Sequence, residues 1–303
     1  MSPNPVRLVH FSDIHITARP LGWQRGDWFT KRLPGWINYQ LGRKFRFRQA
    51  EVVLAALVAD LQRHPPDRVV FSGDATALGF EAEFQRAAEL LGVAGPNALP
   101  GLAVPGNHDY YTPEAAASGL FERYFAPWQV GERLGDAVYP FAQRAGPVWL
   151  VGVNSCTGNR LAWDAAGSVD APQLERLRTL LGRLAPGPRI LVTHYPVCLA
   201  GGQPERRSHG LRNLAQLVDV AVAGGVGLWL HGHRHHAYHL PHPGLAPFPI
   251  ICTGSATQSG LWSYHDYLIE GSRFQVTRRV FVPGENSFRK EGTFELTLQG
   301  ENI

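Results

Sequence analysis

The sequence predicts an α/β protein, because short apolar runs alternate with amphipathic helical patterns along most of its 303 residues. Hydrophobic residues make up 44% of the chain and charged residues 18%, as in globular proteins rather than disordered chains or coiled coils. Each cluster of acidic residues, asparagine and histidine directly follows a predicted strand. Because open α/β sheets bind ligands at the carboxyl ends of their strands, we expect these clusters to meet at one edge.

The first part of the chain contains three predicted strands, at residues 6–11, 68–71 and 101–104. They run into Ser12-Asp13-Ile14-His15, Ser72-Gly73-Asp74 and Gly106-Asn107-His108-Asp109 respectively. Between them, residues 49–63 carry apolar side chains at helical spacing up to Pro65 and Pro66, and residues 80–91 predict a second helix.

The same alternation continues to about residue 235 and is then replaced by strands alone. Strands are predicted at residues 148–153, 189–193 and 226–230, and the last two deliver His194 and the run from His231 to His235. Helices are predicted at residues 173–184 and 211–222. Further strands are predicted at residues 249–253, 264–270, 274–282 and 293–298. We therefore expect a single domain over residues 1–303 whose carboxyl-terminal part, about 248–300, is mostly β.

The polar clusters together offer carboxylate, carboxamide and imidazole ligands, namely Asp13, His15, Asp74, Asn107, His194, His233 and His235. This set suits Mn²⁺, Fe, Zn²⁺ or Ni²⁺, and Asp-x-His and His-x-His place both side chains on one side of an extended segment. Each cluster alone also has a structural explanation, since lone histidines occur in cores and Gly-Asp is common in turns. That explanation gives no reason for all five clusters to follow strands, so we predict a site for two metal ions.

The ordered motifs D-x-H, G-D, G-N-H-D, a lone H and G-H-x-H, from Asp13 to His235, resemble the signature of the calcineurin-like metallophosphoesterases. The resemblance implies a four-layer αββα sandwich with two mixed β-sheets. It also implies two divalent metal ions, for which Mn²⁺ is the first candidate. One ion would be bound by Asp13, His15, Asp74 and His235. The second would bind Asp74, Asn107, His194 and His233, so that Asp74 bridges the two. Ala75 stands where relatives often carry a larger aliphatic residue, a departure that affects packing rather than ligation.

The expected function is metal-dependent hydrolysis of a phosphate ester, most directly as a phosphodiesterase or pyrophosphohydrolase that uses a metal-activated water. The sequence contains no G-x-S-x-G, G-x-x-x-x-G-K-[ST] or H-E-x-x-H motif that would support another chemistry. We expect His108 to stabilise charge or protonate the leaving oxygen, and Asp109 to orient its imidazole. A turn with a capping carboxylate is the structural alternative for this pair. A non-catalytic binding scaffold of the same fold is the functional alternative, although such scaffolds usually lose ligands.

An unusual segment, WFTKRLPGWINYQLGRKFRFR at residues 28–48, has six basic residues, six aromatic residues and no acidic residue. We expect an insertion at about residues 20–48, in which Leu33, Trp36, Ile37 and Leu41 share one helical face flanked by basic side chains, as in interfacial membrane helices. The predicted substrate or membrane contacts are Trp28, Lys31, Arg32, Trp36, Arg43 and Lys44. The alternatives are a basic flap packed on the domain and a segment that binds nucleotide phosphates by stacking.

The insertion also gives a weaker resemblance to bacterial enzymes that cleave the pyrophosphate bond of UDP-2,3-diacylglucosamine in lipid A synthesis. Other family members hydrolyse cyclic nucleotides, which is a further alternative. The partner is thus expected to be a small-molecule or lipid-linked phosphate ester, since a net charge of +4 and the absence of a recognisable module do not indicate nucleic acid.

Location and thiol state are also predicted from composition. No segment approaches ~18 consecutive apolar residues and no signal peptide precedes Val6, so we expect a cytoplasmic protein, with peripheral contact at the inner membrane surface as a further expectation. Cys156, Cys198 and Cys252 lack C-x-x-C spacing and lie in or beside apolar runs, so we expect buried free thiols.

Overall fold

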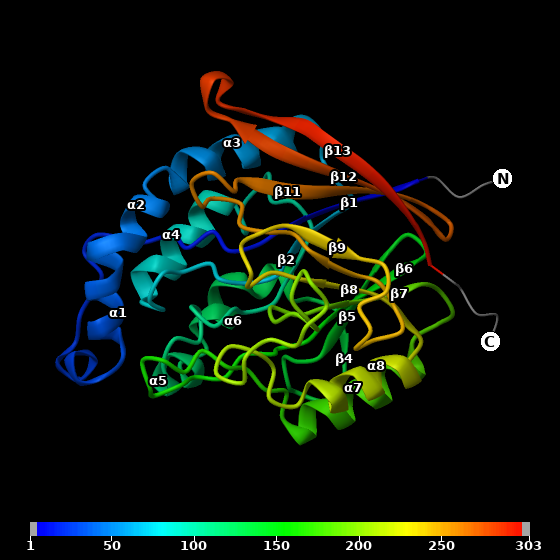
Figure 1. Cartoon of the computed structure of the whole chain (residues 1–303), viewed down its shortest axis with the longest axis horizontal. Coiled ribbons are helices and arrows are strands. Elements are labelled where there is room, and N and C mark those ends of the chain that lie inside the picture. The colour runs from blue at the N-terminus through cyan, green and yellow to red at the C-terminus, as the bar shows by residue number, and fades with distance from the viewer. Residues whose placement is uncertain (1–4, 299–303) are drawn as a thin grey trace.

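The computed structural model describes residues 5–298 and contains two β-sheets that face each other, with helices on their outer faces (Figure 1). The ends of the predicted domain and of the predicted β-rich part, residues 1–4 and 299–303, lie outside the described residues. Both sheets combine parallel and antiparallel strand pairs. The predicted four-layer αββα sandwich with two mixed sheets is confirmed.

The first sheet has the strand order β13-β12-β11-β1-β2-β3. Its strands are β1 (Val6–Phe11), β2 (Arg68–Phe71), β3 (Gly101–Ala103), β11 (Ser263–Glu270), β12 (Arg273–Val282) and β13 (Ser287–Thr297). The second sheet has the order β4-β5-β6-β7-β8-β10-β9. Its strands are β4 (Glu132–Arg133), β5 (Phe141–Ala145), β6 (Val148–Gly152), β7 (Arg189–Val192), β8 (Val226–His231), β9 (Tyr238–Leu240) and β10 (Ile250–Cys252).

The helices fall into an insertion group, two outer layers and short connections. The insertion contains the 3₁₀ helix η1 (Arg25–Phe29), α1 (Arg32–Asn38), the π-helical turn η2 (Tyr39–Arg43) and α2 (Lys44–Arg46). The outer layers contain α3 (Ala50–Arg63), α4 (Glu81–Leu91), α7 (Ala171–Arg183) and α8 (Leu214–Ala223). The connections contain α5 (Pro113–Ala117), α6 (Leu120–Phe125), η3 (Ala126–Trp128) and η4 (Pro283–Glu285).

Three apolar clusters hold the four layers together. Leu8 and Val70 of the first sheet pack with Leu150 and other side chains of the second sheet in the central cluster. A second cluster joins α3 and α4 to the outer face of the first sheet, and a third joins α7 and α8 to the outer face of the second. Since each sheet is covered on both faces, the parallel strands β1, β2, β7 and β8 are buried along most of their length, as parallel strands in α/β proteins usually are.

Two further predictions from composition can be compared with the structure. Cys156, Cys198 and Cys252 are all free and buried, as predicted. Within residues 5–298, none of the helices combines the length and apolar character needed to cross a bilayer.

Candidate metal centre

The seven predicted ligands lie in five loops, each of which follows a strand of one of the two sheets. Asp13 and His15 follow β1, Asp74 follows β2 and Asn107 follows β3, and these three strands are parallel neighbours. His194 follows β7, and the pair His233 and His235 follows β8, its parallel neighbour in the second sheet. The loops of both sheets therefore meet at the carboxyl ends of their strands.

The loops adopt backbone conformations that ordinary side chains rarely occupy. In the described part of the chain, six non-glycine residues have a positive φ, and five of them are candidate ligands: Asp13, His15, Asp74, His233 and His235. Such a conformation costs roughly 1–3 kcal/mol per residue and persists only where the surrounding structure enforces it. The strain is thus concentrated at this edge of the sandwich, where it aims side chains into a common space.

Two glycines allow the loops to approach closely enough for this arrangement. A Cβ atom added to Gly106 would lie 2.1 Å from Asp74 Oδ1, and one added to Gly232 would lie 2.0 Å from Ser12 Oγ. The glycines of the G-N-H-D and G-H-x-H motifs are therefore required by packing against neighbouring loops.

Four of the candidate ligands form the first half of the site. One ligand atom from each of Asp13, His15, Asp74 and His235 lies within 4.8 Å of the others. His15 Nε2 is 3.5 Å from Asp74 Oδ2, and His235 Nε2 is 3.3 Å from Asp13 Oδ1. This is the set that the resemblance assigned to one ion.

The second half of the site shares Asp74 with the first. His194 Nε2 lies 3.5 Å from Asp74 Oδ2 and 3.0 Å from Asn107 Oδ1. His233 Nδ1 lies 2.9 Å from the same Asn107 oxygen. Asp74 Oδ2 is therefore equally far from a histidine nitrogen of each half, which places it between the two sets.

The chemistry of these atoms fits two divalent cations. Asp13 Oδ1 is buried and accepts no hydrogen bond from residues 5–298, and His15 Nε2 faces His235 Nε2 at 3.1 Å. The opposite ring nitrogens face acceptors, with His194 Nδ1 2.8 Å from Ser72 O and His15 Nδ1 3.3 Å from Thr76 O. Those contacts leave the inward nitrogens with free lone pairs, the arrangement found around metal-ligating histidines.

Burial has different consequences for the histidines and for Asp74. It lowers the pKa of His194 and of His233 below the ordinary histidine value, so both imidazoles are neutral ligands at neutral pH. Burial, reinforced by the nearby Asp13 carboxylate, raises the pKa of Asp74 well above its usual range. The seven candidate ligands together are called the cage. Because the cage holds two carboxylates close together, it is electrostatically unfavourable without a bound cation.

The comparison with protein families agrees with this geometry, since the model of the calcineurin-like phosphoesterases matches residues 6–237. The chain belongs to the calcineurin-like phosphoesterase family. It is a metal-dependent phosphoester hydrolase. This calcineurin-like phosphoesterase is 27% identical over 253 residues to a "Probable cyclic nucleotide phosphodiesterase" of Synechococcus, a match that covers 83% of the chain and 81% of the relative.

Solved structures share the fold at low sequence identity. A dimetal phosphatase from Danio rerio superposes with a TM-score of 0.66 at 14% identity, covering 98% of this phosphoesterase and all of that chain. A purple acid phosphatase from yellow lupin gives a TM-score of 0.60 at 13% identity, covering 97% of this chain and 54% of the lupin enzyme. These likenesses support the four-layer fold of the calcineurin-like phosphoesterase.

His108 lies beside the cage of this calcineurin-like phosphoesterase. Its backbone N–H donates to Asp74 Oδ1 at 2.7 Å, and its ring packs edge-on against His15 with centroids 4.8 Å apart. Its Nδ1 lies 2.8 Å from Ala77 O, which assigns the proton to Nδ1 and leaves the lone pair on Nε2. Burial and the nearby Arg43 guanidinium lower the pKa of His108 well below its ordinary value.

Asp109 does not make the hydrogen bond expected with the ring of His108. Its carboxylate instead accepts from the backbone N–H groups of Gly106 at 2.9 Å, Thr76 at 3.0 Å and Ala75 at 3.2 Å. It thereby ties the turn that carries Asp74 to the turn that carries Asn107. The structure gives Asp109 a positioning role beneath the two loops.

The six contacts predicted in the insertion divide into two groups. Lys31 and Arg43 approach the cage, since Arg43 lies 3.3 Å from His108 Nδ1 and Lys31 is buried over the Tyr111 ring at 4.5 Å. The other four do not make such contacts. Arg32 pairs with Asp27 and two backbone carbonyls, Trp36 packs near Trp23, Trp28 stacks on Trp23, and Lys44 bonds Gln40.

The loop after β10 also contacts the site, although the sequence did not predict it there. Gln258 contacts His235 Nδ1, and the hydroxyl of Ser255 donates to Asp13 O at 2.7 Å. The hydroxyl of Thr257 donates to Ile14 O at 2.7 Å. The signal was present, because this polar loop also follows a predicted strand.

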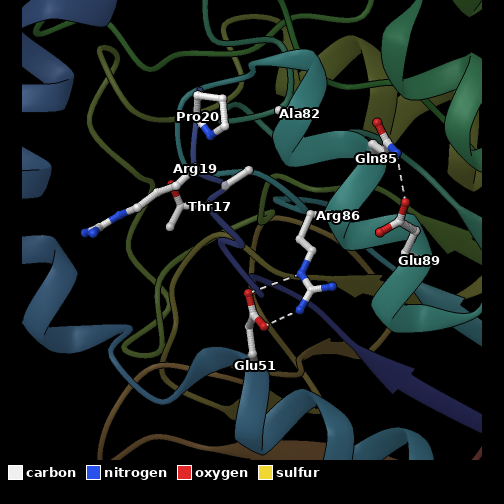
Figure 2. A pocket seen from close by; sticks show the side chains of 9 residues that line it. Thr17, Arg19, Pro20, Glu51, Ala82, Gln85, Arg86 and Glu89 are labelled. Atoms are coloured by element: carbon white, nitrogen blue, oxygen red, sulfur yellow. Dashed lines mark hydrogen bonds and ion pairs between the residues drawn. The ribbon is translucent and has the colours of Figure 1, made fainter. Parts of the chain in front are cut away.

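A separate surface pocket lies on the α3 and α4 side of the calcineurin-like phosphoesterase (Figure 2). Its lining contains none of the candidate ligands, and Arg86 there already pairs with Glu51 at 2.5 Å. This pocket is therefore separate from the candidate metal centre at the strand ends.

Proposed function

We propose that this calcineurin-like phosphoesterase hydrolyses a phosphodiester or pyrophosphate bond with two divalent metal ions. Mn²⁺ is the first candidate for both ions. The observation that carries the proposal is the place of Asp74 Oδ2, 3.5 Å from His15 Nε2 and 3.5 Å from His194 Nε2. Two ions bound there would lower the pKa of a water molecule and neutralise phosphate oxygens. The ions would be held by Asp13, His15, Asp74 and His235 on one side and by Asp74, Asn107, His194 and His233 on the other.

The chain's own contribution to the chemistry is proton transfer and positioning. With its Nδ1 proton held by Ala77 O, His108 can take a proton on Nε2 when a phosphate anion binds nearby, because a negative charge favours the imidazolium. The imidazolium can then protonate the leaving oxygen. Asp109 keeps the Asp74 and Asn107 loops in register during this step.

The first experiment measures hydrolysis after removal of metal and reconstitution with Mn²⁺, Fe²⁺, Zn²⁺ or Ni²⁺. We expect hydrolysis of bis-p-nitrophenyl phosphate with Mn²⁺, slower hydrolysis of p-nitrophenyl phosphate, and none in excess EDTA. Cyclic nucleotides belong in the same panel, because the Synechococcus relative is named as a cyclic nucleotide phosphodiesterase. Failure to hydrolyse any of these with any metal, in protein that is folded, would favour the binding-scaffold alternative.

A lipid-linked phosphate ester is a second candidate, supported by the outer surface of the insertion. Phe29, Leu41 and Phe45 are 92%, 77% and 59% exposed, respectively. Ile37 is also exposed and lies one helical turn before Leu41. Trp36, which was predicted to share a helical face with them, packs inward instead. Arg46 and Arg48 are exposed near this apolar surface, the combination typical of helices that lie on anionic membranes.

This candidate predicts binding to anionic vesicles. We expect the protein to co-sediment with phosphatidylglycerol-containing vesicles at low salt, and the double substitution Leu41→Glu and Phe45→Glu to weaken that binding by about tenfold or more, because each buried side chain contributes roughly 1.5–3 kcal/mol. Val130→Glu, at a residue 69% exposed outside the insertion, is the matched control. Equal sedimentation of all three proteins, or none of the wild type, would rule out the membrane contact.

A further inference from the structure

Two cations of the insertion lie beside the candidate metal centre without an anionic partner in the described part of the chain. Lys31 is 7% exposed, and its ammonium has only a long contact of 3.4 Å to the backbone oxygen of Asp164 besides the Tyr111 ring. Burial lowers the pKa of Lys31 to about 8. Over residues 5–298, no carboxylate oxygen lies within 4.0 Å of either Lys31 or Arg43. Lys31 is buried and Arg43 is half-buried, and charges withdrawn from water in this way are normally paired, so these two are an exception.

The guanidinium of Arg43 also lacks a good hydrogen-bond acceptor. Its two terminal nitrogens lie 3.3 Å from His108 Nδ1 and 3.2 Å from His15 Nδ1. Each of those ring nitrogens also faces a backbone carbonyl, Ala77 O at 2.8 Å and Thr76 O at 3.3 Å, and therefore carries the proton. Neither nitrogen has a lone pair to offer, so the planar donor set of Arg43 remains available for a ligand.

The insertion is packed so that these two side chains are held in place. Arg43 ends the π-helical turn η2, a feature that frequently marks functional sites. The backbone of Gly35 is pressed against Tyr111, since a Cβ atom there would lie 2.1 Å from the phenol oxygen. Tyr111 in turn lies under Lys31 and stacks with His108 at 5.3 Å between centroids. Lys31 and Arg43 thus both adjoin the His108–Tyr111 pair.

We propose that Lys31 and Arg43 form an anion subsite that binds a second phosphate group of the substrate, on the leaving-group side of the scissile phosphate. The proposal rests on the proposed function, in which His108 protonates the leaving group. Two divalent ions, two carboxylates from Asp13 and Asp74 and the metal-activated hydroxide would together leave about one positive charge, which the scissile phosphate alone would neutralise. Two further cations beside His108 therefore favour a diphosphate-bridged ester over a simple phosphodiester.

The first test measures binding and does not depend on turnover. Isothermal titration of metal-free protein with methylenebisphosphonate should show binding that Arg43→Met and Lys31→Met each weaken by about tenfold, because charge-assisted hydrogen bonds are lost. Binding of orthophosphate should weaken less than about threefold. Lys44→Met is the matched control, since that neighbouring ammonium contacts Gln40 and the Phe45 ring instead. Arg43→Lys, which keeps the charge, should restore part of the affinity.

The second test compares substrates in the reconstituted enzyme. We expect Arg43→Met to lower kcat/KM for a nucleoside diphosphate sugar such as UDP-glucose at least tenfold more than for bis-p-nitrophenyl phosphate. Equal losses on both substrates, or unchanged bisphosphonate affinity in the folded variants, would overturn the subsite. If the wild type hydrolyses neither substrate while bisphosphonate binding still depends on Arg43, the reaction proposal fails and the subsite stands.

Discussion

Replacing Asp74 by asparagine is expected to lower kcat/KM for bis-p-nitrophenyl phosphate by about 10³-fold or more, while the protein stays folded. The amide oxygen can still accept from the His108 N–H, now 2.7 Å from Asp74 Oδ1, so the turn should keep its shape. The NH₂ group would replace Oδ2, the atom that faces both His15 and His194. Loss of the shared ligand removes several kcal/mol of charge stabilisation, and each 1.36 kcal/mol is about tenfold in rate.

The metal content of the variant distinguishes the loss of a shared metal ligand from a general folding defect. Elemental analysis of desalted Asp74→Asn should find less bound metal than in the wild type. Asp219→Asn, at an exposed position on α8, is the control and should keep both metal and rate. An Asp74→Asn enzyme with full metal content and wild-type rate would show that Asp74 is not the bridge.

The same substitution should stabilise the metal-free protein. Asp13 and Asp74 are both buried and belong to a group whose ligand atoms lie within 4.8 Å of one another. Removing one of two like charges that lack a cation should raise the melting temperature in EDTA at pH 8. The expected rise is about 2 °C for each kcal/mol gained in the free energy of unfolding. In Mn²⁺ the order should reverse, since only the wild type gains full binding energy. Without bound metal, the two buried carboxylates are therefore expected to destabilise the folded protein.

Sequence patterns could predict the candidate metal site because its candidate ligands follow strands that are mostly buried on both faces. β1 and β2 are mostly apolar, apart from Arg7 and His10 in β1 and Arg68 at the start of β2, and the predicted bounds of both agree with the structure. Once those strands are placed, neighbouring parallel strands bring their carboxyl ends to the same edge of the sheet, and this does not depend on where the helices pack. That is why Asp13, Asp74 and Asn107, far apart in sequence, could be expected at one edge.

Strands β4, β5 and β9 were not predicted, because their sequences carry little periodic signal. β5 reads FAQRA, and β9 is only three residues long. β4 and β9 are the edges of the second sheet, where pairing with one neighbour defines the strand more than its own residues do. Their positions follow from tertiary packing that a local pattern does not contain.

The side chains around the cage were harder to assign than the ligands themselves. Asp109 adjoins His108 in sequence, but the turn closed by Asp109 N–H and Gly106 O at 3.1 Å directs its carboxylate toward backbone amides. The basic residues of the insertion look alike in sequence, yet only Lys31 and Arg43 approach the cage. A regular helical period does not reveal the π-helical turn that ends at Arg43.

His108→Ala is expected to slow turnover without removing metal, by an amount that depends on the leaving group. Proton transfer by a positioned side chain typically contributes about 10²–10⁴-fold. The loss should approach that range for esters with alkoxide leaving groups, which need a proton. It should be much smaller for bis-p-nitrophenyl phosphate, because p-nitrophenolate leaves readily as an anion. The check is the ratio of kcat values for the two substrate types in wild type and variant.

The dependence on leaving group distinguishes proton donation from a purely electrostatic role. If His108 only stabilised charge on the phosphoryl oxygens, both substrate types would slow by a similar factor. His64→Ala, at an exposed histidine after α3, is the control and should leave both rates unchanged. Because the His108 ring bonds Ala77 O and is not among the cage atoms, bound metal should stay at the wild-type level. Equal slowing with metal retained would assign His108 to charge stabilisation and leave the leaving oxygen to be protonated by solvent.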